Sequence, residues 1–418
     1  MKKLFTVLCL CISICAVAQS DTADLRAGAT DMVFYNASTG TKTNASNLDW
    51  HLAFGVRSAI PPYKTNQAAA IRINEAIGVE LYKSPSQKVS GWNSFDTTGW
   101  RGWQRMHNPD TTWTIGALNI NKDFGNDYNY GWGAYSFGSH SVVGDSSVYL
   151  LKMPDGSFRK LAILNLQYDT AFNFLYDKLD NSDYTAAQVR KRLFSNKMFA
   201  YYSLDTKTAT DKEPAISDWD MVFTRYNNTT YDPGNLSQDM GILTNDSRIT
   251  GTEVSSTATQ PCYYGAFSTY INTIGKSWMQ STTPDSLTYY LADATTSQTA
   301  FRFVMNYFGG SYTGKMAFTT TASACATGIA ELNTSEALTV YPVPAVNALH
   351  MRLTSESGYD TEVAVTDIAG RTLLTKDYQV TAGQNDIEMN TSALSAGNYI
   401  ITINTTAGKV SRMISVVR

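Results

Sequence analysis

Residues 337–345 read Ala-Leu-Thr-Val-Tyr-Pro-Val-Pro-Ala and open a region in which apolar and polar residues alternate. The alternation continues through residues 349–353 and 363–368, stops at Ala369-Gly370, and returns in residues 399–403. A period of two places successive side chains on opposite faces of a strand, and glycine-containing dipeptides mark turns. This region therefore predicts short strands that form a small β-sandwich of the immunoglobulin-like kind.

Three segments of this region contain motifs that are more specific than the alternation of apolar and polar residues. They are Val365-Thr-Asp-Ile-Ala-Gly-Arg371, Leu394-Ser-Ala-Gly-Asn-Tyr399 and the final run 409–418. Together they resemble the type A C-terminal sorting domain of the Bacteroidetes type IX secretion system, with a generic immunoglobulin-like module as the alternative. The resemblance assigns residues 336–418 to a sorting domain. It implies recognition by the secretion machinery, removal of the domain, and attachment of the cargo to the cell surface or its release.

The N-terminus predicts export as well. Lys2 and Lys3 precede an apolar stretch that is too short to span a bilayer, and the stretch ends in Ala16-Val-Ala18. Such a pattern is typical of a signal peptide with an A-x-A cleavage site. Residues 1–18 are therefore expected to be removed between Ala18 and Gln19, after which the chain crosses the periplasm. No other stretch reaches eighteen apolar residues, so we expect no transmembrane helix.

Composition narrows the class of protein. Charged residues make up 17% of the chain and the net charge is −3, so no basic surface is available to offset the phosphates of a nucleic acid. Gly, Thr, Ser, Asn and Tyr are abundant, which favours an all-β secreted protein. After signal removal two cysteines stay in the chain, Cys262 and Cys325. They form either one disulfide or two free thiols.

The cargo that precedes the sorting domain contains an internal repeat. Residues 47–54 and 216–223 each place Asp-Trp before an apolar strand that ends in Phe, and we expect that strand to bury its aromatic residue. Residues 147–168 and 286–308 each predict a hairpin whose second strand begins near a Phe-Arg pair. The order of the two elements is the same both times. We therefore expect two β-rich units in the cargo.

We expect the first unit in residues 19–195 and the second in residues 196–322. Residues 323–335 are rich in Ala, Ser and Thr and form the expected linker to the sorting domain. Between the units, residues 184–194 predict a short helix, since Ser182 and Asp183 can cap its start and basic residues occupy its last turns.

Five segments of the second unit resemble the HmuY family of Bacteroidetes, which comprises β-rich haem-binding proteins. The segments are 201–204, 217–226, 240–245, 274–278 and 289–293. The first unit matches this family more loosely. The resemblance implies haem as a cofactor and an outer-membrane TonB-dependent receptor as a partner. It describes a β-fold core more than a ligand, and a fold does not determine a function.

Haem iron in such proteins takes two axial ligands, usually His or Met. His107 and His140 lie in loops surrounded by tryptophan, tyrosine and phenylalanine, so they are candidate axial ligands, and Met106 is a rival. The alternative is that both are loop histidines on an aromatic surface. We favour this alternative because the stronger family resemblance lies in the second unit, which contains no histidine. Met279, beside Trp278, is a weaker candidate in that unit.

Other polar residues predict little chemistry. The Asn/Asp-rich loop 119–129 lacks the spacing and the terminal Glu of an EF-hand, so it favours Asx-turns over a calcium site, and no metal site is expected. His51 is expected to face solvent, opposite Trp50. Asp205, Asp211 and Glu213 are expected to be solvated acids.

We expect no enzyme, because neither a catalytic triad nor a nucleotide-binding or metalloprotease motif is present. The sequence thus favours a secreted or cell-surface, non-enzymatic binding protein that is all-β, with haem capture and delivery to a receptor as the hypothesis. The alternative is a surface module that binds glycans, or a structural or adhesion module, since exposed Trp and Tyr side chains also stack on sugars.

Overall fold

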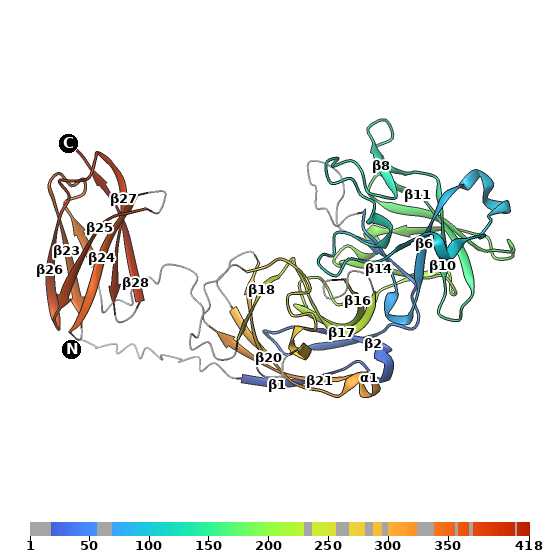
Figure 1. Cartoon of the computed structure of the whole chain (residues 1–418), viewed down its shortest axis with the longest axis horizontal. Coiled ribbons are helices and arrows are strands. Elements are labelled where there is room, and N and C mark those ends of the chain that lie inside the picture. The colour runs from blue at the N-terminus through green and yellow to red at the C-terminus, as the bar shows by residue number, and fades with distance from the viewer. Residues whose placement is uncertain are drawn as a thin grey trace, which may run out of the picture. The chain divides into compact units, whose positions relative to one another are not determined.

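The computed structural model describes residues 18–56, 69–229, 236–255, 267–280, 287–294, 300–323, 338–355, 358–367, 371–405 and 408–418. The chain divides into two compact units, residues 1–324 and 325–418. Both are built from antiparallel sheets, which confirms the all-β prediction (Figure 1). The predicted signal peptide, apart from Ala18, lies outside the described residues, as do Cys262, Cys325 and the linker apart from Ser323.

The C-terminal unit is a two-sheet sandwich, as predicted. One sheet has the order β22-β23-β26 and the other has the order β25-β24-β27-β28. Alternate residues of these strands, such as Leu349, Met351 and Leu353 on β23, are fully buried in one core. The strands are β22 (Leu338–Tyr341), β23 (Ala348–Ser355), β24 (Tyr359–Asp367), β25 (Thr372–Val380), β26 (Gly383–Asn390), β27 (Gly397–Thr405) and β28 (Gly408–Val416).

The N-terminal unit contains two sandwiches. The first, which we call the middle sandwich, packs the sheet β13-β12-β11-β10-β6-β7 against the sheet β15-β14-β4-β5 around one core. Its strands are β4 (Leu52–Gly55), β5 (Ile71–Ile73), β6 (Glu80–Lys88), β7 (Gln104–Met106), β8 (Gly133–Ser136), β9 (Ser141–Gly144), β10 (Ser147–Lys152), β11 (Phe158–Gln167), β12 (Ala171–Lys178), β13 (Thr185–Arg190), β14 (Phe199–Ser203) and β15 (Thr208–Thr210).

The second, which we call the terminal sandwich, joins the two ends of the cargo. It packs the sheet β1-β21-β20-β19-β18 against the sheet β17-β16-β2-β3 around a separate core. Its strands are β1 (Ala18–Asp24), β2 (Asp31–Tyr35), β3 (Lys42–Ser46), β16 (Met221–Asn228), β17 (Ser237–Thr244), β18 (Ile249–Ser255), β19 (Leu287–Asp293), β20 (Ala300–Phe308) and β21 (Lys315–Ser323).

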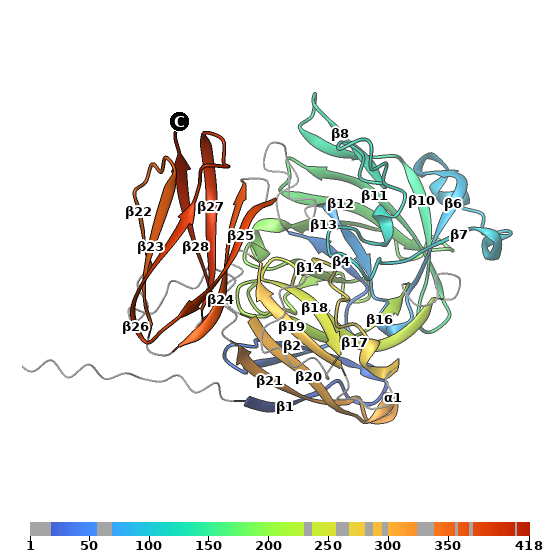
Figure 2. The ribbon, with the colours of Figure 1, turned by 60° about the vertical axis from the view of Figure 1, so that its left-hand side comes forward.

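The two sandwiches make a stack of four layers. The sheets that contain β4 and β16 are the inner layers, and a further apolar cluster with Phe34, Trp50, Tyr201 and Trp219 lies between them. Figures 1 and 2 show β10 and β11 at one end of the stack and β1, β20 and β21 at the other. The interface between the two sandwiches is therefore itself a buried apolar core.

Both repeats seen in the sequence contain the predicted elements in the same order. The predicted division of the chain into two units is nevertheless wrong. Strand β4 pairs with β14, and β16 pairs with β2, so each repeat supplies a strand to the sheet of the other. Likewise β1 completes the sheet of β18–β21, and β13 completes the sheet of β6 and β10–β12. The boundary expected between residues 195 and 196 therefore separates no sheets. The sandwiches instead consist of β4–β15 and of β1–β3 with β16–β21.

A buried asparagine holds the Asp-Trp turn in each repeat. The side-chain amide of Asn74 donates to the carbonyls of Asn47 and Trp50, at 2.7 and 2.8 Å. Asn245 donates in the same way to the carbonyls of Ile216 and Trp219, both at 2.9 Å. Because each amide satisfies two carbonyls of the turn, it positions the tryptophan at the start of the following strand. The two tryptophans consequently occupy equivalent places.

Two local predictions are confirmed and two are wrong. Both hairpins form, with Tyr149 opposite Leu161 and Tyr289 opposite Phe303. The helix expected over residues 184–194 does not form. That segment is β13 followed by the 3-10 turn Lys191–Phe194, because pairing with β12 overrides its weak helical propensity.

His51 is buried and not solvent-facing. Its exposed fraction is 4%, its Nδ1 accepts a hydrogen bond from the Leu204 amide at 3.1 Å, and its Nε2 lies 3.6 Å from Asp205. Burial, the largest effect, lowers the pKa of its imidazole. The parity argument failed because His51 belongs to the turn before β4, where strand alternation does not apply.

The helical turns are short and connect strands. They are η1 (Ala27–Ala29), η3 (Glu75–Ile77), η4 (Val89–Ser94), η5 (Trp100–Gly102), η6 (Ala117–Asn119), η7 (Lys191–Phe194), η8 (Ser277–Gln280) and α1 (Gly310–Thr313). One of them, η3, follows β5 directly and carries a buried glutamate to the interface between the sandwiches.

Candidate binding cavity

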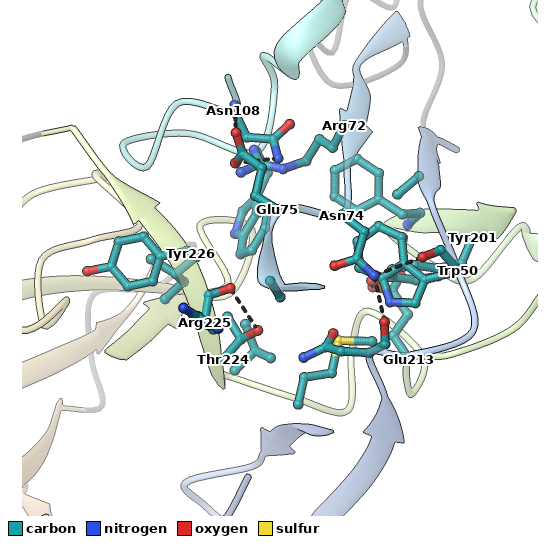
Figure 3. A pocket seen from close by; sticks show the side chains of 18 of the residues that line it. Trp50, Arg72, Asn74, Glu75, Asn108, Tyr201, Glu213, Thr224, Arg225 and Tyr226 are labelled. Atoms are coloured by element: carbon teal, nitrogen blue, oxygen red, sulfur yellow. Dashed lines mark hydrogen bonds between the residues drawn. The ribbon is translucent and has the colours of Figure 1, made fainter. Parts of the chain in front are cut away.

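A cavity of about 80 Å³ lies between the two inner sheets. The strands β2 and β16 of the terminal sandwich and β4, β5 and β14 of the middle sandwich all contribute to its wall. Figure 3 shows Glu75, Arg72 and Asn108 on one side of it, and Trp50, Tyr201 and Glu213 on another. The cavity thus forms where the two repeats meet.

Aromatic side chains make up much of the wall. Trp50 packs edge-on against Tyr201 with ring centroids 4.9 Å apart, and Trp219 packs against Phe34 at 5.1 Å. Trp113 packs against Trp219 and donates its indole N–H to the carbonyl of Thr244 at 2.7 Å. These rings are rigid, so they hold the shape of the cavity without a bound molecule.

Glu75 is a buried carboxylate in this wall. One of its oxygens accepts from the Asn108 amide N–H at 3.1 Å and from Asn227 Nδ2 at 2.6 Å, and the other accepts from Asn108 Nδ2 at 2.8 Å. Burial disfavours the charged form and raises the pKa of Glu75 to about 7, although these hydrogen bonds oppose the shift. Glu75 therefore titrates near neutral pH.

Glu213 is a second buried carboxylate, which corrects the expectation that it is solvated. Its exposed fraction is 4%. It accepts hydrogen bonds from the amides of Met198 and Phe199 and from the Tyr201 hydroxyl, the last at 3.2 Å. Burial raises the pKa of Glu213 to about 8. Asp205 and Asp211 are exposed as expected, with 62% and 51% of their side chains accessible.

Arg72 is the buried cation nearest in sequence to Glu75. Its guanidinium donates to the carbonyls of Thr112, Ile115 and Pro109, at 2.9, 3.2 and 3.1 Å. It also lies over the ring of Trp113, 4.9 Å from the centroid. Burial lowers the pKa of Arg72 to about 10, so it stays charged at neutral pH. Arg72 forms no ion pair with either buried carboxylate among the residues described, but its charge attracts Glu75 and opposes the rise in the pKa of that carboxyl.

Five polar atoms of the wall are buried without a hydrogen-bond partner among the described residues. They are the Oδ1 atoms of Asn47, Asn74 and Asn227 and the Nε1 atoms of Trp50 and Trp219. The amide groups of the three asparagines already donate to carbonyl or carboxylate oxygens, so their orientation is determined and the unpartnered atoms are oxygens. An unsatisfied buried polar atom costs about 1–3 kcal/mol. Such atoms gathered around one cavity mark a site that receives polar molecules.

The predicted haem ligands Met106, His107 and His140 do not line this cavity, although His107 directly precedes the lining residue Asn108. Met106 has an exposed fraction of 1% and packs in the core of the middle sandwich. His107 follows it, is half-buried, and has a pKa lowered chiefly by burial. Across the sheet, Met106 pairs with Leu81, Leu81 with Leu151, and Leu151 with Arg159. His107 is therefore level with the start of β11, with β6 and β10 between them.

His140 lies at the opposite end of β11. It precedes β9, whose Val142 pairs with Leu166, and it is exposed with its Nδ1 3.5 Å from the Tyr135 hydroxyl. Seven residues separate Arg159 from Leu166, which corresponds to about 23 Å along a strand. Two ligands of one metal are each only ~2 Å from it. The sheet therefore does not bring His107 and His140 together as an axial pair.

The Asn/Asp-rich loop 119–129 and Met279 are the remaining candidates. In the loop 119–129, Asp123 and Asn126 form Asx-turns by accepting from the amides two residues further on, as predicted. Among the described residues, no cluster of three or more His, Cys, Asp or Glu side chains suited to a metal ion is present. Met279 is 47% exposed on the surface.

Sequence reasoning missed Arg72, Glu75, Asn108 and the two indole nitrogens. The segment Ile71-Arg-Ile-Asn-Glu75 carried a signal, since it places two charged residues beside β-branched residues that are expected in a core. The asparagines could have been found by extending the repeat, because Asn74 and Asn245 follow the two Asp-Trp turns at similar spacing. Nothing in the sequence indicated that both carboxylates would line one cavity.

Comparison with known proteins defines the C-terminal unit. Residues 339–417 match the family model of the secretion system C-terminal sorting domain. This unit is therefore a sorting domain of the type IX secretion system, and the protein is secreted or displayed on the cell surface. The domain implies interaction with the secretion machinery.

The cargo has no such assignment. No curated protein matches the chain. The crystal structure of dimeric latent PorU from Porphyromonas gingivalis aligns over 67% of this chain with 12% identity and a TM-score of 0.17, which is too low to support an argument. The aligned part spans 32% of that protein. The resemblance to the HmuY family finds no support in these comparisons. In the described part of the chain, no helix has the length and apolar character needed to cross a membrane.

Proposed function

We propose that the cargo is a binding protein that holds a small ammonium compound in the cavity between the two sandwiches. The observation that carries this proposal is the set of three buried asparagine oxygens without donors beside the carboxylates of Glu75 and Glu213. Acceptors exceed donors in this wall, so the complementary ligand carries several N–H groups. The two indole N–H groups, of Trp50 and Trp219, leave room for one acceptor on the ligand.

The charge of the wall favours a cation. Three acidic residues of the wall, Glu75, Glu213 and Asp110, outnumber its two basic residues, Arg72 and Arg225. A bound cation would favour the ionised forms of Glu75 and Glu213, whose pKa values burial has raised. The aromatic rings of the wall add attraction to a cation through their electron-rich faces.

The size of the cavity limits the ligand. About 80 Å³ is roughly half of the ~150 Å³ of an apolar cavity that admits benzene. Ethanolammonium meets the size, the charge and the pattern of donors and acceptors. We propose binding and not catalysis, because each carboxylate already accepts three hydrogen bonds from the protein, which hold it in place as a recognition group.

The test is calorimetric titration and thermal denaturation of the full mature chain with ethanolammonium chloride, beside ethylene glycol as a neutral molecule of similar size. We expect saturable binding and stabilisation by the ammonium compound only. Glu213→Gln should weaken binding about tenfold, as expected for loss of a charge-assisted hydrogen bond. Asp211→Asn, which removes an exposed carboxylate two residues away, should change nothing. Equal binding of both compounds would show that the cavity does not select a cation, and binding of neither would show that it admits no such ligand; either result would reject the proposal.

Haem capture, with delivery to an outer-membrane receptor, stays a prediction of the sequence resemblance. The cavity is too small for a porphyrin, since sites for drug-sized ligands measure about 300–1,000 Å³. Haem would therefore bind at the surface, with His107 and His140 as separate ligands and not as an axial pair. A haemin titration of the His107→Ala/His140→Ala double variant tests this: a Soret band that the variant loses would support a haem role for these residues.

A further inference from the structure

Arg225 on β16 lies where the central cavity meets the surface. Its side chain lines the cavity and also two surface grooves, which share Gly28 as well. Figure 3 shows Arg225 at the edge of the cavity beside Thr224 and Tyr226. The residue is half-buried, and no residue that the structure describes forms a hydrogen bond or ion pair with its guanidinium. A guanidinium held in this way is available to an anion from solution.

One of these grooves, which we call the Tyr312 groove, has a volume of about 830 Å³, and two aromatic residues, Phe308 and Tyr312, are part of its lining. Tyr312, on the short helix α1, is 91% exposed, and Phe308 and Met279 extend the apolar surface beside it. An exposed tyrosine of this kind is positioned by its neighbours: α1 ends at Gly314, whose amide and carbonyl bond to Gly310 and Leu25. The backbone that carries the ring is therefore held in a short helical turn and not at the end of a long loop.

The polar side chains of the groove leave a single positive charge. Asp239 lies in the groove and pairs with Lys276, so that these two charges cancel. Gln238 and Ser311 are neutral groups that can exchange hydrogen bonds with hydroxyls. Arg225 is the charge that has no counterpart among the described residues of the groove.

We propose that the Tyr312 groove binds a glycan that carries carboxylate groups. A sugar carboxylate pairs with Arg225, and a neighbouring sugar ring stacks on Tyr312. The fork of N–H donors on a guanidinium matches the two oxygens of a carboxylate, and an aromatic face packs against the C–H groups of a sugar ring. The groove is within the ~300–1,000 Å³ range of ligand sites and is open, so a polymer can pass through it. Arg225 borders both this groove and the cavity of the proposed ammonium site, whereas Tyr312 lines the groove alone, so Tyr312 distinguishes the two sites.

The proposal is tested by affinity electrophoresis and calorimetry of the full mature chain with polygalacturonate. The comparison ligand is the same polymer after methyl esterification, which keeps the sugar rings and removes the carboxylate charges. We expect binding of the acidic polymer and at least about tenfold weaker binding of the ester, the loss expected for one charge-assisted pair. Sialyllactose beside lactose tests whether a single terminal carboxylate is sufficient.

Two variants assign the site. Tyr312→Ala and Arg225→Ala should each abolish or strongly weaken retardation, and Arg225→Lys should restore part of it, because lysine keeps the charge without the fork. Tyr307→Ala is the matched control, since Tyr307 is 57% exposed on β20 and does not line the groove. Loss of glycan binding in Tyr312→Ala with unchanged ammonium binding would support a separate site. Equal binding of the ester, or binding that survives both alanine variants, would overturn the proposal.

Discussion

Trp50 and Trp219 occupy equivalent positions in the two repeats, and their indole nitrogens are both buried at the same cavity without a partner among the residues that the structure describes. Each follows the aspartate of an Asp-Trp turn, and each turn is held by one buried asparagine. The repeats meet through the inner sheets, so the two rings approach one cavity from opposite sandwiches. A duplicated structural element has in this way produced a shared polar site.

Mutation should distinguish the roles of Asn74 and Asn245, the two asparagines that hold the turns. Asn74→Ala and Asn245→Ala each leave two buried carbonyls without a donor, so each should lower the free energy of unfolding by about 2–4 kcal/mol. Asn74 lines the cavity and Asn245 does not, so only Asn74→Ala should also weaken ammonium binding. Urea denaturation and calorimetry measure the two effects. Equal binding by both variants would contradict the place of Asn74 in the site.

Stability should depend on pH through the two buried glutamates. Their pKa values are raised to about 7 and about 8, so the folded state binds protons more tightly than the unfolded state does. Their contribution is therefore fully present below about pH 4.5 and is lost as the pH rises through 7 to 8. Urea denaturation across this range should show a smaller pH-dependent loss for Glu75→Gln and Glu213→Gln than for the wild type. Asp211→Asn should follow the wild type.

Ammonium binding should have the opposite pH dependence. The ligand requires ionised carboxylates, so its affinity should rise about tenfold between about pH 6 and 8. Titrations in two buffers of different ionisation enthalpy should show proton release upon binding near neutral pH. In Glu213→Gln both the pH dependence and the released protons should decrease. An affinity that is constant over this range would exclude both carboxylates as ligand groups.

Arg72 should be required for the loop that closes the cavity. Arg72→Met removes three hydrogen bonds to the carbonyls of Pro109, Thr112 and Ile115 and the contact with Trp113. Each buried carbonyl left without a donor costs about 1–3 kcal/mol, so the midpoint of urea unfolding should fall clearly. Arg72→Lys should not restore it, because a single ammonium cannot reach the three carbonyls together. Full rescue by lysine would show that only the charge matters.

Local features were predictable from the sequence where they depend on neighbouring residues. The hairpin at Tyr149 and Leu161 formed because alternation and a Pro-Asp-Gly turn act over a few residues. The segment 184–194 was misread because its helical signal is weak and pairing with β12 outweighs it. Glu213 was misread because its burial depends on strand β14 and on the opposite sheet, neither of which is adjacent in sequence.

The sequence by itself determined the destination of the protein, its all-β class and its internal repeat. Sorting motifs, alternation and the Asp-Trp turns are short patterns that persist in any arrangement of the sheets. Only the tertiary structure decided that β4 pairs with β14 and β16 with β2, and therefore that Glu75 and Glu213 line one cavity. The physical reason is that strand pairing between distant segments is chosen by the packing of whole apolar faces, which no local stretch of residues encodes.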